Sequence, residues 1–93
     1  MNLTKLFERS SRRVWRLKEK PDDSTLLDLY ALYKQATEGD AKSPHPIPDG
    51  MVGMAKWRAW RRLRGTSVEE AMERYCELVD SLMNRSGSSA SPS

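Results

Sequence analysis

Three residues whose side chains could bind an anion and a ring lie close together near the middle of the chain. Tyr30 and Lys34 are four residues apart, and Tyr33 adjoins Lys34. If this segment is helical, the helical period places a hydroxyl, an aromatic face and an ammonium on one surface patch. Such a patch can hold a nucleotide, because an ammonium binds phosphate and a ring stacks on a base. Half-buried tyrosines and a solvated lysine on an ordinary amphipathic helix fit the same spacing.

Residues that could carry out catalysis or bind a metal are scattered along the chain. His45 lies alone in a proline-containing stretch, and Cys76 is the single cysteine. Ser10 and Ser11 have no base positioned by the sequence, and no glycine-rich phosphate loop is present. A lone cysteine is more often a small buried hydrophobe than a reactive thiol. The sequence therefore predicts a non-enzymatic protein with no cofactor and no metal site.

Apolar residues recur at helical spacing in two segments of the first half. The first segment ends before Pro21, and its row consists of Leu3, Phe7, Ser10, Val14 and Leu17. The second helix is predicted over about residues 23–38, where acidic residues can cap its start and Gly39 can provide a left-handed C-terminal cap. Its stripe consists of Leu26, Leu27, Tyr30, Tyr33, Lys34 and Thr37.

Two further helices are predicted after a polar, proline-containing loop over residues 40–50. The third runs from about Val52 to Arg64, and its Trp57 and Trp60 are expected in the core. The fourth follows Ser67, which has the spacing of a capping box, and ends at about residue 84. Its row consists of Met72, Tyr75, Val79 and Leu82. The predicted fold class is therefore all-α, a four-helix bundle.

Length and composition favour one small domain. Of the 93 residues, 1–85 are predicted to form the helical domain, and the Ser-rich residues 86–93 are expected to be a disordered tail. The formal net charge of +3 suggests anionic partners without naming one. The single cysteine, the lack of a signal-peptide pattern and the lack of a long apolar run lead us to expect a cytoplasmic protein without stable membrane insertion.

Several blocks of the sequence together resemble the acyl-CoA-binding protein family. The blocks read LKEKP from Leu17, LYALYKQATEGD from Leu29, AKWRAW from Ala55, and LRGTS from Leu63, followed by Ala71, Met72 and Tyr75. They span most of the chain without an insertion, so coincidence is far less plausible than for one short motif. The resemblance implies a four-helix bundle of the acyl-CoA-binding protein type, with a shallow bowl that binds medium-to-long-chain acyl-CoA esters.

The resemblance also implies which residues bind the ligand and what they do. Lys34 and Lys56 are expected as counter-charges for the 3′-phosphate of coenzyme A, and Tyr33 as the ring that stacks on adenine. Tyr30 and Tyr75 are expected to donate their hydroxyl hydrogens. In cells the implied role is buffering or transport of acyl-CoA by a monomer, with acyl-CoA-using enzymes as further partners.

The chain departs from the family pattern at three apolar positions. Val52 and Met54 stand where many members have lysines, and Trp15 stands where a polar residue is usual. Trp15 either packs beside the bowl or lies exposed. The exchange at positions 52 and 54 either weakens contact with the ligand's phosphates or extends the apolar surface for the acyl chain. The three residues together motivate the hypothesis of a more apolar site for the acyl chain.

Two alternative functions stay open. The domain could keep the fold as an interaction module without the ligand. It could also bind nucleic acid weakly through two arginine-rich helix faces, which comprise Arg9, Arg12, Arg13 and Arg16 on the first helix and Arg58, Arg61, Arg62 and Arg64 on the third. The small net charge and the neighbouring glutamates disfavour nucleic acid as a partner.

Overall fold

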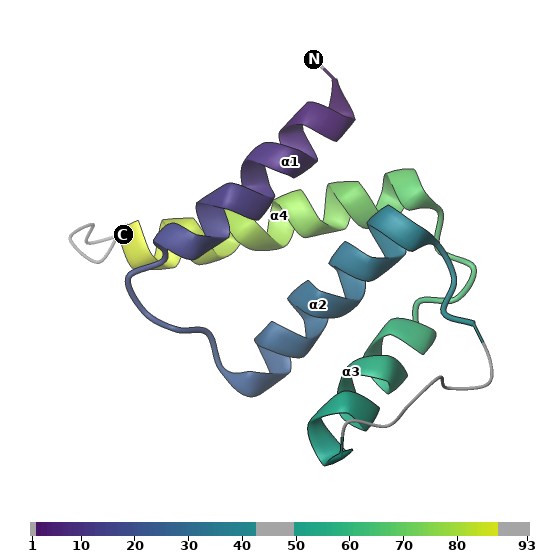
Figure 1. Cartoon of the computed structure of the whole chain (residues 1–93). Coiled ribbons are helices and arrows are strands. Elements are labelled where there is room, and N and C mark those ends of the chain that lie inside the picture. Colours follow the sequence, from purple (N-terminus) through teal and green to yellow (C-terminus); the bar gives the residue numbers. More distant parts are fainter. Residues whose placement is uncertain (1, 43–49, 88–93) are drawn as a thin grey trace.

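The computed structural model describes residues 2–42 and 50–87, excluding the side chains of residues 86 and 87. Within these residues the chain forms four α-helices and one 3-10 turn (Figure 1), namely α1 (Leu3–Arg13), η1 (Val14–Arg16), α2 (Asp23–Glu38), α3 (Gly50–Arg61) and α4 (Val68–Gly87). No strand occurs in this part of the chain. The predicted all-α, four-helix fold is confirmed.

Side-chain caps explain where α2 and α4 begin. The Asp22 carboxylate accepts a hydrogen bond from the amide of Thr25 at 2.8 Å, and this contact lowers the pKa of Asp22. The Ser67 hydroxyl accepts from the amide of Glu70 at 3.0 Å. Each cap satisfies an amide that has no partner within its own helix, and both agree with the predicted helix starts.

The first predicted helix is divided into two elements. α1 ends at Arg13, and the chain continues as η1 instead of remaining α-helical to Leu17. The amide of Leu17 bonds to the carbonyl of Val14 at 3.4 Å, and Leu17 itself has extended backbone. Tightening of the last turn to 3-10 geometry is common at helix ends, and sequence periodicity does not distinguish it from an α-helical turn.

The ends of α3 and α4 also differ from the prediction. α3 begins at Gly50 and ends at Arg61, so it lies two to three residues earlier than predicted. α4 continues to Gly87, past the predicted end at residue 84. Most of the predicted loop (residues 43–49, including His45) and most of the predicted tail (residues 88–93) lie outside the described residues.

Gly39 closes α2 in a conformation that favours glycine. Its amide bonds to the carbonyl of Gln35 at 3.1 Å, and its φ is 79°. The positive φ was expected for a cap. However, ψ is −151°, which lies outside the left-handed helical region. The chain therefore leaves α2 in an extended direction.

α2 lies at the centre of the fold, between α3 on one side and α4 on another, and α1 packs across α4 (Figure 1). The buried core comes from α1, α2 and α4, and consists of Phe7, Leu29, Leu32, Ala36, Ala71, Tyr75, Val79 and Leu82. α3 contributes no buried residue. The side chains of Trp57 and Trp60 on α3 are only half-buried. The prediction that they belong to the buried core is therefore wrong.

The buried face of α2 differs from its predicted stripe. Leu29, Leu32 and Ala36 are buried, whereas Tyr33, which lies in the stripe, is 42% exposed. Both sets of residues recur at helical spacing, because α2 packs on more than one side. The predicted stripe is the partly exposed face of α2, and it carries the candidate ligand-binding residues.

A buried amide ties the end of α2 to the turn before α4. The side chain of Gln35 is fully buried, and its Nε2 donates to Asp40 Oδ1 and to the carbonyl of Thr66, both at 2.8 Å. Asp40 Oδ1 also accepts from the amide of Gly65 at 2.9 Å. The bond from Gly65, followed by the bond from Gln35, lowers the pKa of Asp40. These four residues form one polar tie between segments that are distant in the sequence.

We expect Gln35→Ala to destabilise the fold by about 2–4 kcal/mol, because it removes two hydrogen bonds and leaves a cavity at a fully buried position. Urea unfolding followed by circular dichroism measures this change. Ser81→Ala, at an exposed position of α4, is the control and should change stability by less than about 0.5 kcal/mol. Equal stability of the two variants would contradict a stabilising role for the tie.

The Asp40 carboxylate predicts a specific acid sensitivity. Because its pKa is lower in the folded state than the ordinary value of 3.8, its contribution to stability is present above that value and is lost as the pH falls through the folded pKa. Asp40→Asn keeps an acceptor oxygen but cannot titrate. Unfolding free energies measured from about pH 6 to pH 2 should therefore fall less steeply for the variant below about pH 4. Parallel curves for variant and wild type would refute this.

Candidate functional site

The five predicted ligand-binding residues come from three helices and lie on connected surfaces. Tyr30, Tyr33 and Lys34 project from α2, Lys56 from α3 and Tyr75 from α4. Ring contacts link α2 to both of its neighbours: Lys56 lies over Tyr30, and Tyr33 contacts Tyr75. The structure therefore brings Tyr33 into contact with Tyr75, which is 42 positions away in the sequence.

One side of the site is an aromatic cluster of Phe7, Tyr33 and Tyr75. The ring of Phe7 is stacked with Tyr33 at 5.5 Å and meets Tyr75 edge-on at 5.0 Å, and the two tyrosine rings are 6.1 Å apart. Phe7 and Tyr75 are buried, at 4% exposure each, whereas Tyr33 is 42% exposed. The two buried rings support Tyr33, whose exposed ring surface is available for stacking. Phe7 was predicted only as an apolar residue of its helix.

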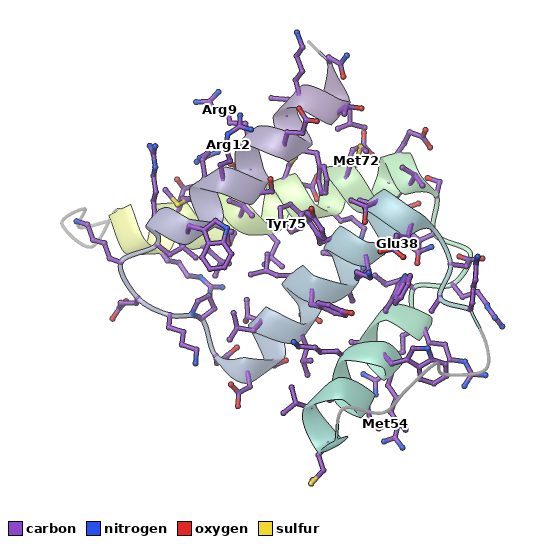
Figure 2. The ribbon with its side chains drawn as sticks, viewed as in Figure 1. Arg9, Arg12, Glu38, Met54, Met72 and Tyr75 are labelled. Atoms are coloured by element: carbon purple, nitrogen blue, oxygen red, sulfur yellow. The ribbon has the colours of Figure 1, made fainter. Side chains whose placement is uncertain are left out.

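Tyr75 projects from α4 into the space between α4 and α2 (Figure 2). Burial, followed by the neighbouring Tyr33, raises the pKa of the Tyr75 hydroxyl to about 12. The hydroxyl therefore keeps its proton at neutral pH and can act as a hydrogen-bond donor. Only 4% of the residue is exposed, so little of Tyr75 is accessible to a ligand.

The other side of the site holds two lysines against aromatic rings. The ammonium of Lys56 is 5.4 Å from the centre of the Tyr30 ring, and that of Lys34 is 4.9 Å from the centre of the Trp60 ring. Cation–π contacts of this kind restrain a long side chain that would otherwise sample many rotamers. Both ammonium groups are thereby held near the junction of α2 and α3.

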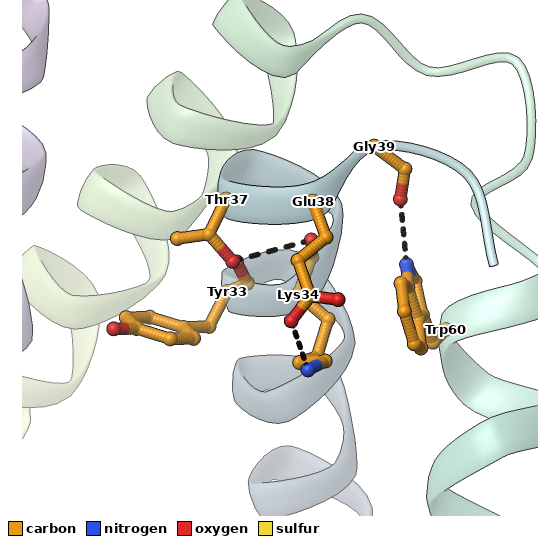
Figure 3. Close-up of polar contacts among 6 residues, drawn as sticks. All are labelled: Tyr33, Lys34, Thr37, Glu38, Gly39 and Trp60. Atoms are coloured by element: carbon orange, nitrogen blue, oxygen red, sulfur yellow. Dashed lines mark hydrogen bonds and ion pairs between the residues drawn. The ribbon is translucent and has the colours of Figure 1, made fainter.

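Trp60 connects this side of the site to the end of α2. Its Nε1 donates to the carbonyl of Gly39 at 2.8 Å (Figure 3). The ring beneath Lys34 is thus positioned by a hydrogen bond as well as by packing. This bond anchors α3 to the end of α2, although the Trp60 ring is only half-buried.

A carboxylate that the sequence analysis did not single out lies beside Lys34. Glu38, one helical turn further along α2, accepts a hydrogen bond from the Lys34 ammonium (Figure 3). The Lys34 side chain is 24% exposed and that of Glu38 is 52% exposed. The four-residue spacing was available in the sequence as a signal for this ion pair.

The three apolar departures from the family pattern lie on two elements. Trp15 in η1 is 86% exposed and Val52 at the start of α3 is 66% exposed, while Met54 of α3 is half-buried (Figure 2). Of the two alternatives for Trp15, the exposed one is correct. The hypothesis of a more apolar acyl site stays a prediction.

A hollow of about 490 Å³ lies on the opposite face of α2. It is lined by Asp28, Ala31, Leu32, Ala59, Arg62, Leu63, Arg74, Glu77 and Leu78, and by none of the five predicted residues. Arg74 lies 3.9 Å from Glu70, and Asp28 and Glu77 add two carboxylates to the lining. The two carboxylates balance the two arginines of the lining, Arg62 and Arg74, so the hollow offers a phosphate no net positive charge. The chemistry therefore favours the face with the tyrosines and lysines over this hollow.

The arginine-rich face of the first helix is separate from the candidate site. A hollow of about 260 Å³ is lined by Arg9, Arg12, Arg13, Arg16 and Met83. Arg9 and Arg12 project away from α2 (Figure 2), and Arg13 is paired with Asp80 of α4 at 2.8 Å. The expectation that nucleic acid is not a partner stays a prediction.

In residues 2–42 and 50–87, no group of three or more His, Cys, Asp or Glu side chains could hold a metal ion. Over the same ranges, none of the helices combines the length and the apolar character needed to cross a membrane. The thiol of Cys76 is free and half-buried, and it packs against the core.

The fold and the candidate site define a class: a small all-α protein that carries candidate ligand-binding tyrosines and lysines on three helices. Comparisons with known proteins identify the family to which this fold belongs. The family described as "Acyl CoA binding protein" matches residues 4–79. The chain is 44% identical over 81 residues to the acyl-CoA-binding protein of Saccharomyces cerevisiae, covering 87% of this chain and 93% of the yeast protein. It is 41% identical over 91 residues to that of Brassica napus, covering 98% and 99% respectively.

The fold is also that of a solved relative. The crystal structure of Oryza sativa Acyl-CoA-Binding Protein 2 matches with a TM-score of 0.85 and 35% sequence identity, covering 99% of this chain and 100% of the rice chain. The chain therefore belongs to the acyl-CoA-binding protein family.

Proposed function

We propose that this protein binds medium-to-long-chain acyl-CoA esters without catalysis, and that it buffers or transports them in the cytoplasm as a monomer. The observation that carries the proposal is the placement of two ammonium groups, Lys34 and Lys56, at the junction of α2 and α3, while the exposed ring of Tyr33 projects from the same helix α2 toward α4. A dianionic phosphate and a purine need this combination of groups. Family membership supports the same ligand.

The nucleotide end of the ligand would use the five predicted residues. Lys34 and Lys56 would bind the 3′-phosphate by charge-assisted hydrogen bonds, and Tyr33, supported by Phe7, would stack on adenine. Tyr30 lies beneath Lys56 and would donate its hydroxyl hydrogen next to the same phosphate. Tyr75 would donate from the core side, where its raised pKa keeps it protonated.

The acyl chain would add a large but unspecific contribution to affinity. About fourteen methylenes at roughly 0.8 kcal/mol each give an upper bound near 11 kcal/mol, which ordering and association costs reduce. Affinity should therefore depend on chain length, whereas the phosphate and adenine contacts select coenzyme A esters over free fatty acids.

Calorimetric titration with palmitoyl-CoA tests the proposal. We expect saturable one-to-one binding, much weaker binding of coenzyme A or palmitate alone, and a loss of at least about tenfold in affinity for Lys34→Ala/Lys56→Ala, because each lysine supplies a charge-assisted bond. The matched control is Arg62→Ala/Arg74→Ala, which removes two positive charges from the hollow on the opposite face of α2.

The control variant should bind like the wild type. Loss of binding in the control, with retention in the lysine variant, would move the ligand to the opposite hollow. A wild-type protein that gives no heat with palmitoyl-CoA at micromolar concentrations would support the alternative of a helical module that has lost its ligand.

A chain-length series tests the apolar acyl site. Affinity should rise by at least about tenfold from octanoyl-CoA to palmitoyl-CoA, because eight more methylenes leave water. Trp15→Ala and Val52→Ala should weaken binding of palmitoyl-CoA more than that of octanoyl-CoA if these exposed side chains contact the distal part of the chain. Equal affinity across the series would contradict an apolar acyl site.

A further inference from the structure

The ammonium that the proposed function assigns to the ligand's phosphate already has an anionic partner. Lys34 donates to the carboxylate of Glu38, and it also lies 4.9 Å from the centre of the Trp60 ring. The Glu38 carboxylate is half-exposed, and it sits at the end of α2 on the side that faces α3 (Figure 2; Figure 3). An incoming phosphate would therefore approach a lysine whose charge is locally balanced.

The second lysine of the site is in a different state. Lys56 lies over the uncharged ring of Tyr30, and among the described residues it forms no ion pair with a carboxylate. The two lysines are thus not equivalent. Within the described residues, Lys34 shares its ammonium with the carboxylate of Glu38, whereas Lys56 lies against a neutral ring.

The carboxylate and the phosphate cannot both bind Lys34 without repelling each other. Two oxygens that accept hydrogen bonds from one ammonium lie roughly 4–5 Å apart. At this separation, two anions at a protein surface repel each other appreciably. If Glu38 instead rotates into solvent, its charge still remains one helical turn from Lys34. Glu38 therefore opposes phosphate binding in either arrangement.

The ion pair itself is too weak to be needed for folding. Both side chains reach solvent, and in this pair the lysine precedes the glutamate, which is the less favourable order within a helix. A purely structural role would thus be small. The Glu38 carboxylate would therefore change the affinity for a phosphate held by Lys34 more than it changes the stability of the fold.

We propose that Glu38 competes with the ligand's phosphate for the ammonium of Lys34. This competition keeps the affinity for the nucleotide end of the ligand lower than it would be without a negative charge at position 38. This inference rests on the proposed binding of acyl-CoA at this site. Its consequence is faster release of the ligand, because affinity differences at one site are expressed mainly in the dissociation rate.

The test is Glu38→Gln, which keeps the shape of the side chain and removes its charge. Palmitoyl-CoA should bind about three- to tenfold more tightly to the variant at low ionic strength, and the difference should shrink at about 0.5 M salt. The palmitoyl thioester of 3′-dephospho-coenzyme A should bind wild type and variant equally. Stopped-flow measurements should show that the gain lies in slower dissociation.

Glu70→Gln is the matched control. Glu70 is also half-exposed and also faces a cation one turn away, Arg74, but it lies on α4 outside the candidate site. It changes the net charge of the protein by the same amount, so it separates a local effect from the overall field. We expect its affinity for palmitoyl-CoA to equal that of the wild type.

The outcomes separate the inference from the function on which it rests. If the wild type binds palmitoyl-CoA and Glu38→Gln binds equally or more weakly, the competitor role is wrong and the binding function stands. If Glu38→Gln and Glu70→Gln gain equally, or if the dephospho ligand gains as much as palmitoyl-CoA, Glu38 does not act on the phosphate and the inference is overturned. Absence of wild-type binding would overturn the proposed function itself.

Discussion

The fold depends on a buried polar contact that joins α2, the chain that leaves it at Asp40, and the turn at Thr66 before α4. Gln35 is fully buried in α2, and its amide is the donor that joins the carboxylate of Asp40 to the carbonyl of Thr66. Both donors of the Gln35 amide are satisfied, which fixes the relative positions of its two partners, whereas its Oε1 has no partner among the described residues. The end of α2 is thereby held against the turn that leads into α4, and the carbonyl of Gly39, next to this tie, receives the indole of Trp60.

α2 must serve the core and the binding surface at once. Leu29 and Leu32 face the core, whereas Tyr30, Tyr33 and Lys34 face the candidate site. Because the two sets alternate along the same helix, a rotation or shift of α2 would displace both together. The aromatic cluster strengthens this link, since Phe7 and Tyr75 are core residues that also position the exposed ring of Tyr33.

Much of this arrangement could be predicted from the sequence, and the exceptions have physical causes. Caps at Asp22 and Ser67 were predictable because a capping hydrogen bond is local. The 3-10 end of the first helix was not, because its periodicity resembles that of an α-helix. The burial of Gln35 was missed, because the partners that make a buried amide favourable are chosen by tertiary contacts. The core face of α2 was not identified, because the predicted stripe, which is partly exposed beside α3 and α4, recurs at the same helical spacing.

The candidate site was also predictable only in part from the sequence. The five residues were predicted through the resemblance, and the local spacing explains the three on α2. Distances between helices are not encoded in local patterns, so the contacts of Lys56 with Tyr30 and of Lys34 with Trp60 became visible only in the fold. Trp15 illustrates the limit most clearly: the sequence allowed a packed or an exposed indole, and only the structure distinguishes them.

α3 packs against α2 without contributing a buried residue, which gives a bound ligand a structural role at this junction. α3 has no buried residue, and its contacts with α2 include two cation–π pairs and the hydrogen bond from Trp60 to Gly39. A phosphate that bound Lys34 of α2 and Lys56 of α3 together would join the two helices directly. Any ligand that binds only the folded state stabilises it by mass action, and a ligand that bridges both lysines would oppose separation of α3 from α2. The affinity for the ligand would then be coupled to the position of α3. Because Glu38 lies beside Lys34, its charge would influence both the affinity and the position of this helix.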